Sequence, residues 1–329
     1  MSKMTPLLKI KNLHVQFKTF EGELKVLNGL DMTIGEGEKV GLVGETGCGK
    51  TTTMKSVLQI LPIPPAKISA GEIFYRGRDI LKMKPNEVRG FIRGEITAIF
   101  QDPIAALNPV FTIGYQLHDI IKQSPKARGQ KRLSKQEARS RAIAVLKETD
   151  MPDPERILRS YPIQLSGGMR QRVCISEALS TVAKLLIADE PTTNLDVTIQ
   201  DQILRQLDEL VLTRKTSILL ITHSLGVIKN LMERVFIMYA GNIVEVAKTK
   251  DVFADPFHPY TRALLKTVPK LTGEGVSEGI EGRIPDYLNP PEGCRFHPRC
   301  SKAMTICKKE RPPFFSVGNS HKVACFLYS

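Results

Sequence analysis

The chain has 329 residues, of which 42% are hydrophobic and 25% charged. This length and composition exclude a fibrous or disordered chain and allow about two domains with a buried core. The 47 Lys and Arg residues against 34 Asp and Glu give a net charge of +13, which by itself fits nucleic acid, an anionic membrane surface or phosphate-rich ligands as partners. The charge is concentrated, because residues 122–147 carry a net +8 and residues 283–329 a net +5.

The sequence lacks the features of a membrane-spanning or exported chain. It has no run of about 18 apolar residues, and its N-terminus, MSKMTPLLKIK, has no apolar core of a signal peptide. We therefore expect a cytoplasmic protein.

Strand and helix signals alternate over the first 250 residues. An apolar run at 39–44 ends in glycine, and the segment after it has helical spacing until Pro62. Other short apolar runs have the length and boundaries of buried strands, and a further segment reads as a hairpin that turns at Ala240, Gly241 and Asn242; these segments are 96–100, 185–189, 217–222 and 235–247. The pattern predicts an α/β fold with a central sheet.

Two further regions differ from this alternating pattern. Residues of about 104–165 are mostly helical, and Ser134 and Glu137 have the spacing of a capping box. After Lys250 the composition shifts to Pro, Gly and Cys with little periodicity. We therefore predict one domain of residues 1–250 and a small irregular region of residues 251–329.

The segment GETGCGKT, which begins at Gly44, matches the GxxxxGK[ST] pattern of a P-loop, and it lies between a predicted strand and a predicted helix. In such a loop, backbone N–H groups point inward as an anion site, Lys50 reaches the outer phosphates and the Thr51 hydroxyl binds Mg²⁺. The predicted nucleotide-binding residues of this segment are Gly44, Glu45, Thr46, Gly47, Cys48, Gly49, Lys50, Thr51 and Thr52. We expect the Cys48 thiol to be exposed and reactive when no nucleotide is bound.

Acidic residues follow the predicted strand 185–189. The apolar run brings Asp189 to the end of the strand, where a carboxylate can hold the Mg²⁺ shell. Glu190 comes next, in a position to orient and deprotonate a water that attacks the γ-phosphate.

A second phosphate-binding element lies between these motifs. In LSGGMRQR, Ser166, Gly167 and Gly168 precede a segment that can form a helix, so a hydroxyl and bare backbone N–H groups lie at a helix N-terminus. One nucleotide seldom needs two such elements from one chain.

The order of these elements resembles that of the ABC ATPase family over residues of about 7–250. The resemblance implies a P-loop fold with an antiparallel β subdomain and a helical subdomain at about 104–165, and it implies ATP and Mg²⁺ as ligands. In this family two subunits pair head to tail, so that the signature of one, here Ser166 to Met169, closes over the nucleotide of the other. Met169 stands where many members have Gln.

The resemblance also assigns single residues. Gln101 fits the glutamine that contacts Mg²⁺ and the attacking water, Asp196 fits the loop that crosses the dimer interface, and His223 fits the histidine that contacts the γ-phosphate. Phe20 is the predicted aromatic that stacks on adenine, with Phe17 as the alternative and a core role open for either.

Four segments look like those of the oligopeptide, dipeptide and nickel import subgroup: FQDPIAALNP, LSGGMRQRVCISEAL, FADPFHPYTRALLKTVP and GCRFHPRC. This likeness implies an ATPase subunit at the cytoplasmic face of the membrane that powers peptide import. The implied partners are a second ATPase subunit, either different or identical, two transmembrane permease subunits and, indirectly, an extracytoplasmic substrate-binding protein.

The last 36 residues contain Cys294, Cys300, Cys307 and Cys325. In a reducing compartment such a group more often binds metal than forms disulfides, and four thiolates suit Zn²⁺ or a [4Fe-4S] cluster equally well. The subgroup's extension is similar to ones that hold [4Fe-4S], so we expect the cluster, with Zn²⁺ or metal-free thiols as alternatives. His297 and His321 are possible substitute ligands.

Two other functions remain to be weighed. A non-transport ABC ATPase of DNA repair or translation would carry a long coiled-coil insertion or two cores in tandem, whereas this chain has one uninterrupted core. A metal-containing nucleic-acid-binding protein would use the +5 region and its nearby Phe residues, but no recognised spacing supports it, and we expect no nucleic-acid partner.

Overall fold

The computed structural model describes residues 6–127, 133–193, 195, 197–267, 279–318 and 320–329. The chain forms two compact units, one of Met1–Lys82 with Leu220–Ser329 and the other of Met83–Leu219. No helix among the described residues is long and apolar enough to cross a membrane.

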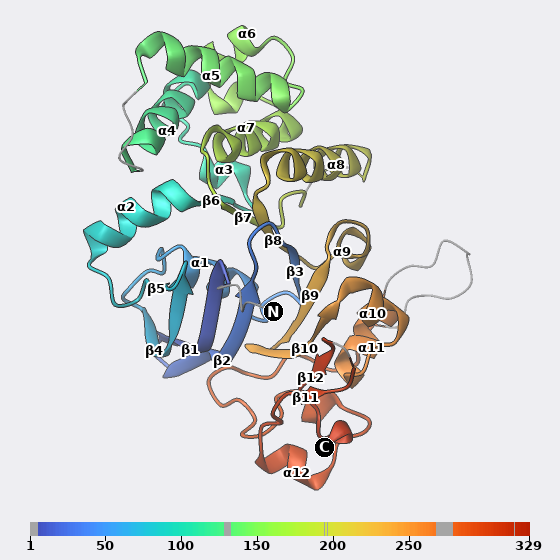
Figure 1. Ribbon diagram of the computed structural model, residues 1–329. Coiled ribbons are helices and arrows are strands. Elements are labelled where there is room, and N and C mark those ends of the chain that lie inside the picture. Colours follow the sequence, from blue (N-terminus) through green and yellow to red (C-terminus); the bar gives the residue numbers. More distant parts are fainter. Residues whose placement is uncertain (1–5, 128–132, 194, 196, 268–278, 319) are drawn as a thin grey trace. The chain divides into compact units, whose positions relative to one another are not determined.

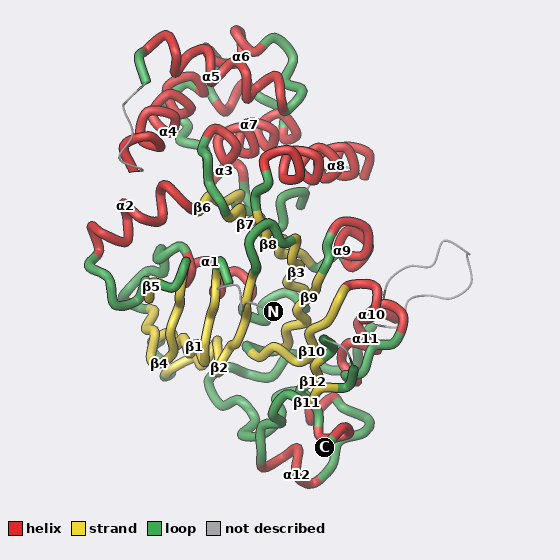
Figure 2. Tube along the Cα trace, in the orientation of Figure 1, coloured by secondary structure: helices red, strands yellow, loops and turns green. Residues whose placement is uncertain are grey.

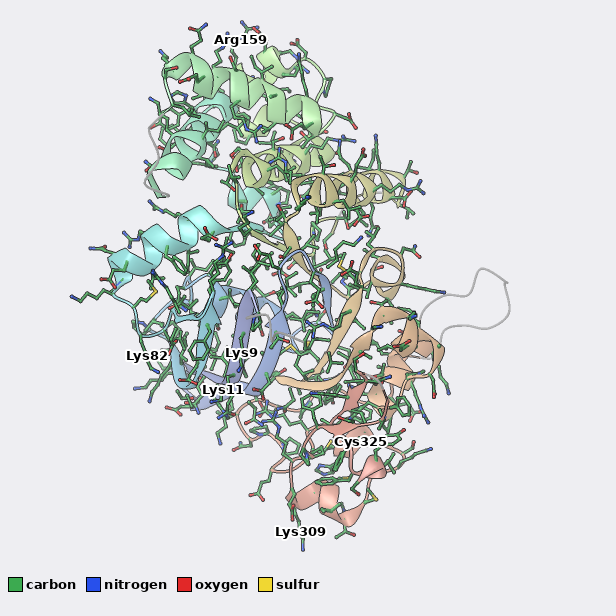
Figure 3. All side chains as sticks on the ribbon, viewed as in Figure 1. Lys9, Lys11, Lys82, Arg159, Lys309 and Cys325 are labelled. Atoms are coloured by element: carbon green, nitrogen blue, oxygen red, sulfur yellow. The ribbon has the colours of Figure 1, made fainter. Side chains whose placement is uncertain are left out.

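The first unit contains an antiparallel sheet in the order β2-β1-β4-β5 (Figure 1), whose strands are β1 (Leu8–Lys18), β2 (Glu23–Ile34), β4 (Ala66–Tyr75) and β5 (Arg78–Asp79). Alternation along β1 puts Leu8 and Ile10 in the core and Lys9 and Lys11 outside. Lys11 and Lys82, both labelled in Figure 3, form surface ion pairs with Glu72 at 3.5 and 3.2 Å.

A second set of strands in the first unit has the order β11-β12-β10-β9-β3. Its members are β3 (Lys39–Val43), β9 (Arg234–Tyr239), β10 (Asn242–Lys248), β11 (Phe315–Ser316) and β12 (Lys322–Val323). β3 and β9 are parallel, and the predicted hairpin of β9 and β10 turns through Ala240 and Gly241, both at positive φ. Gly41 in β3 lets the helix α9 (Leu225–Leu231) pack closely, since a Cβ there would lie 2.6 Å from Ile228.

The helices of the first unit surround these strands and continue into the C-terminal region. They are α1 (Lys50–Val57), α9 (Leu225–Leu231), α10 (Thr249–Ala254), α11 (Pro259–Lys266), α12 (Thr305–Lys309) and the 3-10 helices η2 (His297–Arg299) and η3 (Phe326–Tyr328). Figure 2 shows that the C-terminal region is mostly loop, as its composition predicts. α1 ends at Val57, earlier than the predicted stop at Pro62.

The second unit contains the parallel pair β6 (Ile96–Ile99) and β7 (Leu185–Asp189) and a group of helices. These are α2 (Pro85–Glu95), α3 (Pro103–Ala106), α4 (Ile113–Ala127), α5 (Lys135–Glu148), α6 (Pro154–Arg159), the 3-10 helix η1 (Pro162–Gln164), α7 (Gly167–Ser180) and α8 (Val197–Arg214). The predicted capping box begins α5, because Ser134 and Glu137 exchange backbone and side-chain hydrogen bonds. β8 (Ser217–Thr222) contains the boundary between the units.

The predicted α/β fold is confirmed, and each predicted strand is present. The division into compact units differs from the predicted domains. The second unit includes α2, α7 and α8 as well as the predicted helical segment of about 104–165, and residues after Lys250 join the first unit because β12 pairs with β10. A domain boundary after Lys250 stays a prediction.

Candidate functional site

The P-loop joins β3 to α1 in the first unit. Gly44 follows the buried strand directly, and a Cβ there would clash with the Met238 carbonyl and with Cys48 Sγ. Gly49, at φ 109°, precedes the first residue of α1. Thr46 and Gly47 are exposed at the tip, so the loop presents backbone N–H groups to solvent beside a helix N-terminus.

The side chain of Lys50 lies inside this loop. Its Nζ donates to the carbonyl oxygens of Gly44 at 2.7 Å and Glu45 at 3.0 Å, and the residue is 6% exposed. Thr51 and Thr52 are partly buried in the first turn of α1. The loop is thus shaped around a cation that can exchange its carbonyl partners for phosphate oxygens.

The expectation for Cys48 is wrong. Its side chain is fully buried against the loop backbone, and burial raises the pKa of the thiol to about 11. A protonated, inaccessible thiol is a poor nucleophile. Cys48 therefore acts as a small packing residue of the loop, as Cys174 does in α7 at 5% exposed.

Two further predicted nucleotide contacts belong to the first unit. Phe20 is fully exposed in the turn between β1 and β2, and the alternative, Phe17, is partly buried within β1. His223 is exposed directly after β8. All three assignments stay predictions.

In the second unit, Gln101, Asp189 and Glu190 lie around the end of β7. Asp189 is 2% exposed at the last position of the strand. Glu190 adopts a left-handed backbone with φ of 46°, which is rare outside glycine, and its Oε2 accepts from Gln101 Nε2 at 3.3 Å and from Thr193 Oγ1 at 2.9 Å. The structure thus brings the predicted base and the predicted glutamine together.

The signature begins α7. Ser166 is the N-cap residue, and its Oγ accepts from the backbone N–H of Met169 at 3.3 Å. Ser166 and Gly167 are exposed, and a Cβ on Gly167 would meet nothing within 4 Å. A hydroxyl and open N–H groups therefore face solvent, as a phosphate-binding helix end requires. Asp196, the predicted dimer-loop residue, lies outside the described residues.

Comparison with known proteins decides the family. A family model described as "ABC transporter" matches residues 27–193, and one described as "Oligopeptide/dipeptide transporter, C-terminal region" matches residues 244–307. The oligopeptide transport ATP-binding protein OppD of Bacillus subtilis is 42% identical over 99% of this chain and 90% of its own length. The dipeptide transport ATP-binding protein DppD of the same organism is 41% identical over 98% and 95%. The chain belongs to the ABC transporter family.

Solved structures agree with this assignment. The dimeric post-hydrolysis structure of the ATP-binding cassette MJ0796, bound to ADP and Pi, has a TM-score of 0.66 and 26% identity, covering 74% of this chain and 98% of that one. The cbiO1 protein of Clostridium perfringens, part of the cbiONQ transporter complex, has a TM-score of 0.62 and 27% identity over 76% and 91%. This ABC protein is an ATPase, with ATP and Mg²⁺ as its expected ligands.

The four C-terminal cysteines of this ABC ATPase line one small cavity, together with His258 and His297. All four are free, and Figure 3 labels Cys325 within this region. Among the described residues, no group of three or more His, Cys, Asp or Glu side chains is arranged to hold a single metal ion. The sequence analysis named His297 but not His258 as a possible substitute ligand, although both line the cavity.

His321 does not lie at the cavity and so does not serve as a substitute ligand there. Its Nε2 contacts the fully buried Glu245 carboxylate at 2.7 Å. The same carboxylate accepts from the backbone N–H groups of Phe257 and His258. His321 therefore secures the C-terminal region.

Several basic residues of the +5 region are used inside the protein. Arg295 donates to the Ala240 carbonyl at 2.6 Å, Arg311 donates to two backbone carbonyls of β2, and Arg299 pairs with Glu45. Their charges hold the C-terminal region to the ATPase core, which weakens the argument for a nucleic-acid surface there.

A cavity of about 440 Å³ lies within the second unit, lined among others by Arg93, Phe100, Ala106, Asp119 and Glu177. Glu177 Oε1 is buried and has no hydrogen-bond partner among the described residues. Burial raises the pKa of this carboxyl from 4.5 to about 8. Sequence patterns assigned Glu177 no role, because it lies within the segment LSGGMRQRVCISEAL but in no phosphate-binding or metal-binding spacing.

Glu177 should therefore make stability depend on pH. Between its unfolded pKa of 4.5 and its folded value of about 8, the folded protein holds a proton that the unfolded chain releases, so stability falls as pH rises. In Glu177→Gln this loss is absent. The unfolding temperature of Glu177→Gln minus that of the unmodified protein should be at least about 2 °C larger at pH 8 than at pH 5.5. If this difference is the same at both pH values, the shifted pKa is contradicted.

Proposed function

We propose that this ABC ATPase is the ATP-hydrolysing subunit that powers import of peptides across the cytoplasmic membrane, at whose inner face it binds. The observation that carries the proposal is the joint match of one chain to the ABC transporter family and, over residues 244–307, to the C-terminal region of oligopeptide and dipeptide transporters. Relatives named for oligopeptide and dipeptide transport, aligned over nearly the whole chain, support it.

The nucleotide site is proposed to combine groups of two kinds. The P-loop N–H groups and Lys50 bind the phosphates, and Phe20 stacks on adenine. Thr51, Asp189 and Gln101 offer hydroxyl, carboxylate and amide oxygens, a donor set that suits Mg²⁺, which neutralises phosphate charge when bound. Thr51 lies in α1, Asp189 ends β7, and Gln101 lies in the loop after β6.

Glu190 is the proposed general base. Its carboxylate takes a proton from the attacking water as the water oxygen bonds to the γ-phosphorus, the bond to the bridging oxygen breaks, and ADP and phosphate leave. The hydrogen bond from Gln101 holds the carboxylate in place, and His223 contacts the γ-phosphate. Ser166, Gly167, Gly168 and Met169 bind the nucleotide of a second ATPase subunit, identical or related, with Asp196 at the dimer interface.

Replacing Glu190 with Gln should lower ATP hydrolysis at least about 100-fold, because the amide cannot accept the proton. ATP binding and ATP-dependent dimerisation should persist, as measured by calorimetry and size-exclusion chromatography. Glu209→Gln, an exposed position of α8, is the matched control and should hydrolyse ATP normally. Unchanged hydrolysis in Glu190→Gln would exclude this residue as the base.

The cavity of the second unit is the proposed docking place for a cytoplasmic segment of one of the two permease subunits. Phe100, which lines it, directly precedes Gln101, so an occupant would contact the strand that positions the Glu190 partner. The unpartnered Glu177 oxygen offers an acceptor for a donor group of the incoming segment. An extracytoplasmic binding protein would deliver the peptide to the permease.

A bulky side chain in this cavity should prevent assembly. Ala106→Trp lies at an exposed, lining position and should abolish copurification with the permease subunits and peptide uptake, while ATP binding by the isolated subunit is retained. Ala105→Trp, which is exposed next to it but does not line the cavity, is the control. Equal effects of both variants, or none, would place the permease contact elsewhere.

The four cysteines are proposed to hold a metal centre, a [4Fe-4S] cluster in preference to Zn²⁺. Their shared cavity supports a common ligand. The cluster is preferred because structural zinc sites usually contain tight CxxC pairs, which the Cx5Cx6Cx17C spacing lacks. Such a centre would tie down a region with few apolar residues.

Cys300→Ser should lose the centre, whereas Cys174→Ala, buried in α7, should keep it. Iron, sulfide and zinc content per chain and the visible absorption spectrum measure this on anaerobically purified protein. If the unmodified protein contains zinc and no iron, the centre is a Zn²⁺ site and not a cluster. If it contains neither metal, the four thiols hold no metal and the proposal is wrong.

A further inference from the structure

Three side chains of the C-terminal region contact the first half of the P-loop. The Tyr260 hydroxyl accepts from the Glu45 backbone N–H at 3.0 Å, and the Tyr287 hydroxyl donates to the Gly47 carbonyl at 2.8 Å. Arg299 forms a bidentate ion pair with the Glu45 carboxylate, with N–O distances of 2.8 and 3.1 Å. P-loop residues 45–47 are thus bonded to residues more than 200 positions later in the chain.

Each of these side chains is itself fixed. Arg299 also donates to the carbonyls of Ile280 and Glu281, so its guanidinium is held on several sides and is 5% exposed. Tyr260 is fully buried and packs against Tyr239 and Phe296, with ring centroids 4.7 and 5.4 Å away.

The backbone beside Tyr287 is anchored as well. Its carbonyl accepts from the Lys25 N–H of β2 at 2.8 Å, and Leu288 N–H donates to Asp286. All of the contacts lie within the first unit. Groups held this firmly can define the shape of the loop they contact.

Of the three contacts, that of Arg299 is the one that involves a charged residue of the P-loop, Glu45. Glu45 lies inside the segment that cradles phosphates, and an unpaired carboxylate there would repel a triphosphate. A planar guanidinium that binds the carboxylate through two N–H groups both cancels this charge and holds it away from the loop's N–H groups.

We propose that Arg299, Tyr260 and Tyr287 are positioning residues of the nucleotide site: they hold the P-loop in its phosphate-binding shape, and Arg299 neutralises Glu45. The proposal rests on the proposed nucleotide site at residues 44–52 and adds to it a dependence on the C-terminal region. ATP affinity is then set in part by residues that lie outside the ATPase motifs.

The test measures Mg·ATP binding by the full-length subunit, with kcat and KM for ATP. Arg299→Ala should weaken ATP binding about tenfold, because Glu45 is left unpaired. Arg299→Lys keeps the charge but cannot form the bidentate ion pair, so its affinity for ATP should lie between those of Arg299→Ala and the unmodified protein. At saturating ATP, kcat should change less than about threefold, so that the effect falls on KM.

Rescue separates positioning from simple loss of folding. Arg299→Ala combined with Glu45→Gln removes the unpaired carboxylate and should bind ATP several-fold more tightly than Arg299→Ala alone, a result that general destabilisation would not give. Tyr287→Phe, which removes only the hydroxyl, should weaken binding about threefold. The proposal is overturned if the double variant binds ATP no more tightly than Arg299→Ala, or if Arg299→Ala binds ATP as tightly as the unmodified protein.

Two matched controls come from the same region. Arg311→Ala loses its hydrogen bonds to Asn28 and Gly29, and Tyr328→Phe loses one to Phe257, but neither side chain contacts the P-loop. Both should bind ATP like the unmodified protein, and an effect equal to that of Arg299→Ala would overturn the proposal. Lys50→Ala tests the nucleotide site separately: if it binds ATP normally, the proposed site itself is wrong.

Discussion

The rest of the nucleotide site depends on the close approach of the P-loop to the β9–β10 turn. Gly241 N–H donates to the Cys48 carbonyl at 2.8 Å, and a Cβ on Gly44 would clash with the Met238 carbonyl. Backbone therefore meets backbone on one side of the loop, while Thr46 and Gly47 at its tip are exposed. Lys50 lies at the centre of the loop and donates to the carbonyls of Gly44 and Glu45. Gly44 is needed because a side chain there would separate the two backbones, and Gly241, at positive φ, because a side chain would clash with the Val26 carbonyl of β2.

The hydrolytic groups depend on a different constraint. Asp189 ends a fully buried strand, and the left-handed φ of Glu190 turns the chain at once, so that the neighbouring carboxylates need not share one environment. One is 2% exposed, while the other is tied to Gln101 and Thr193 by hydrogen bonds. Strain at Glu190 is offset by these partners, and the same bonds link the proposed base to the loop after β6.

The strands and the P-loop could be predicted from sequence because each rests on a local pattern: an apolar run, a glycine spacing, a capping box at Ser134. The contacts between Arg299 and Glu45 could not, since they join residues 254 positions apart and neither position follows a period. The reactivity of Cys48 was predicted wrongly for the same reason, because the residue is buried where the loop meets the distant β9–β10 hairpin, whose Gly241 N–H donates to the Cys48 carbonyl. Glu177 likewise carries no motif, and only the packing of α7 shows its carboxyl to be desolvated.

Part of the net charge of +13 is used inside the protein. Three arginines of the C-terminal region bond to the ATPase core: Arg295 and Arg311 donate to backbone carbonyls, and Arg299 pairs with Glu45. Arginine suits this task, because one guanidinium can satisfy several backbone acceptors that a loop-rich region leaves open. The region also buries Phe296, whose ring packs on Tyr239 of β9, and three of its polar contacts end on the P-loop. The bonds made by Arg299, Tyr260 and Tyr287 thus belong both to the attachment of the region and to the P-loop itself.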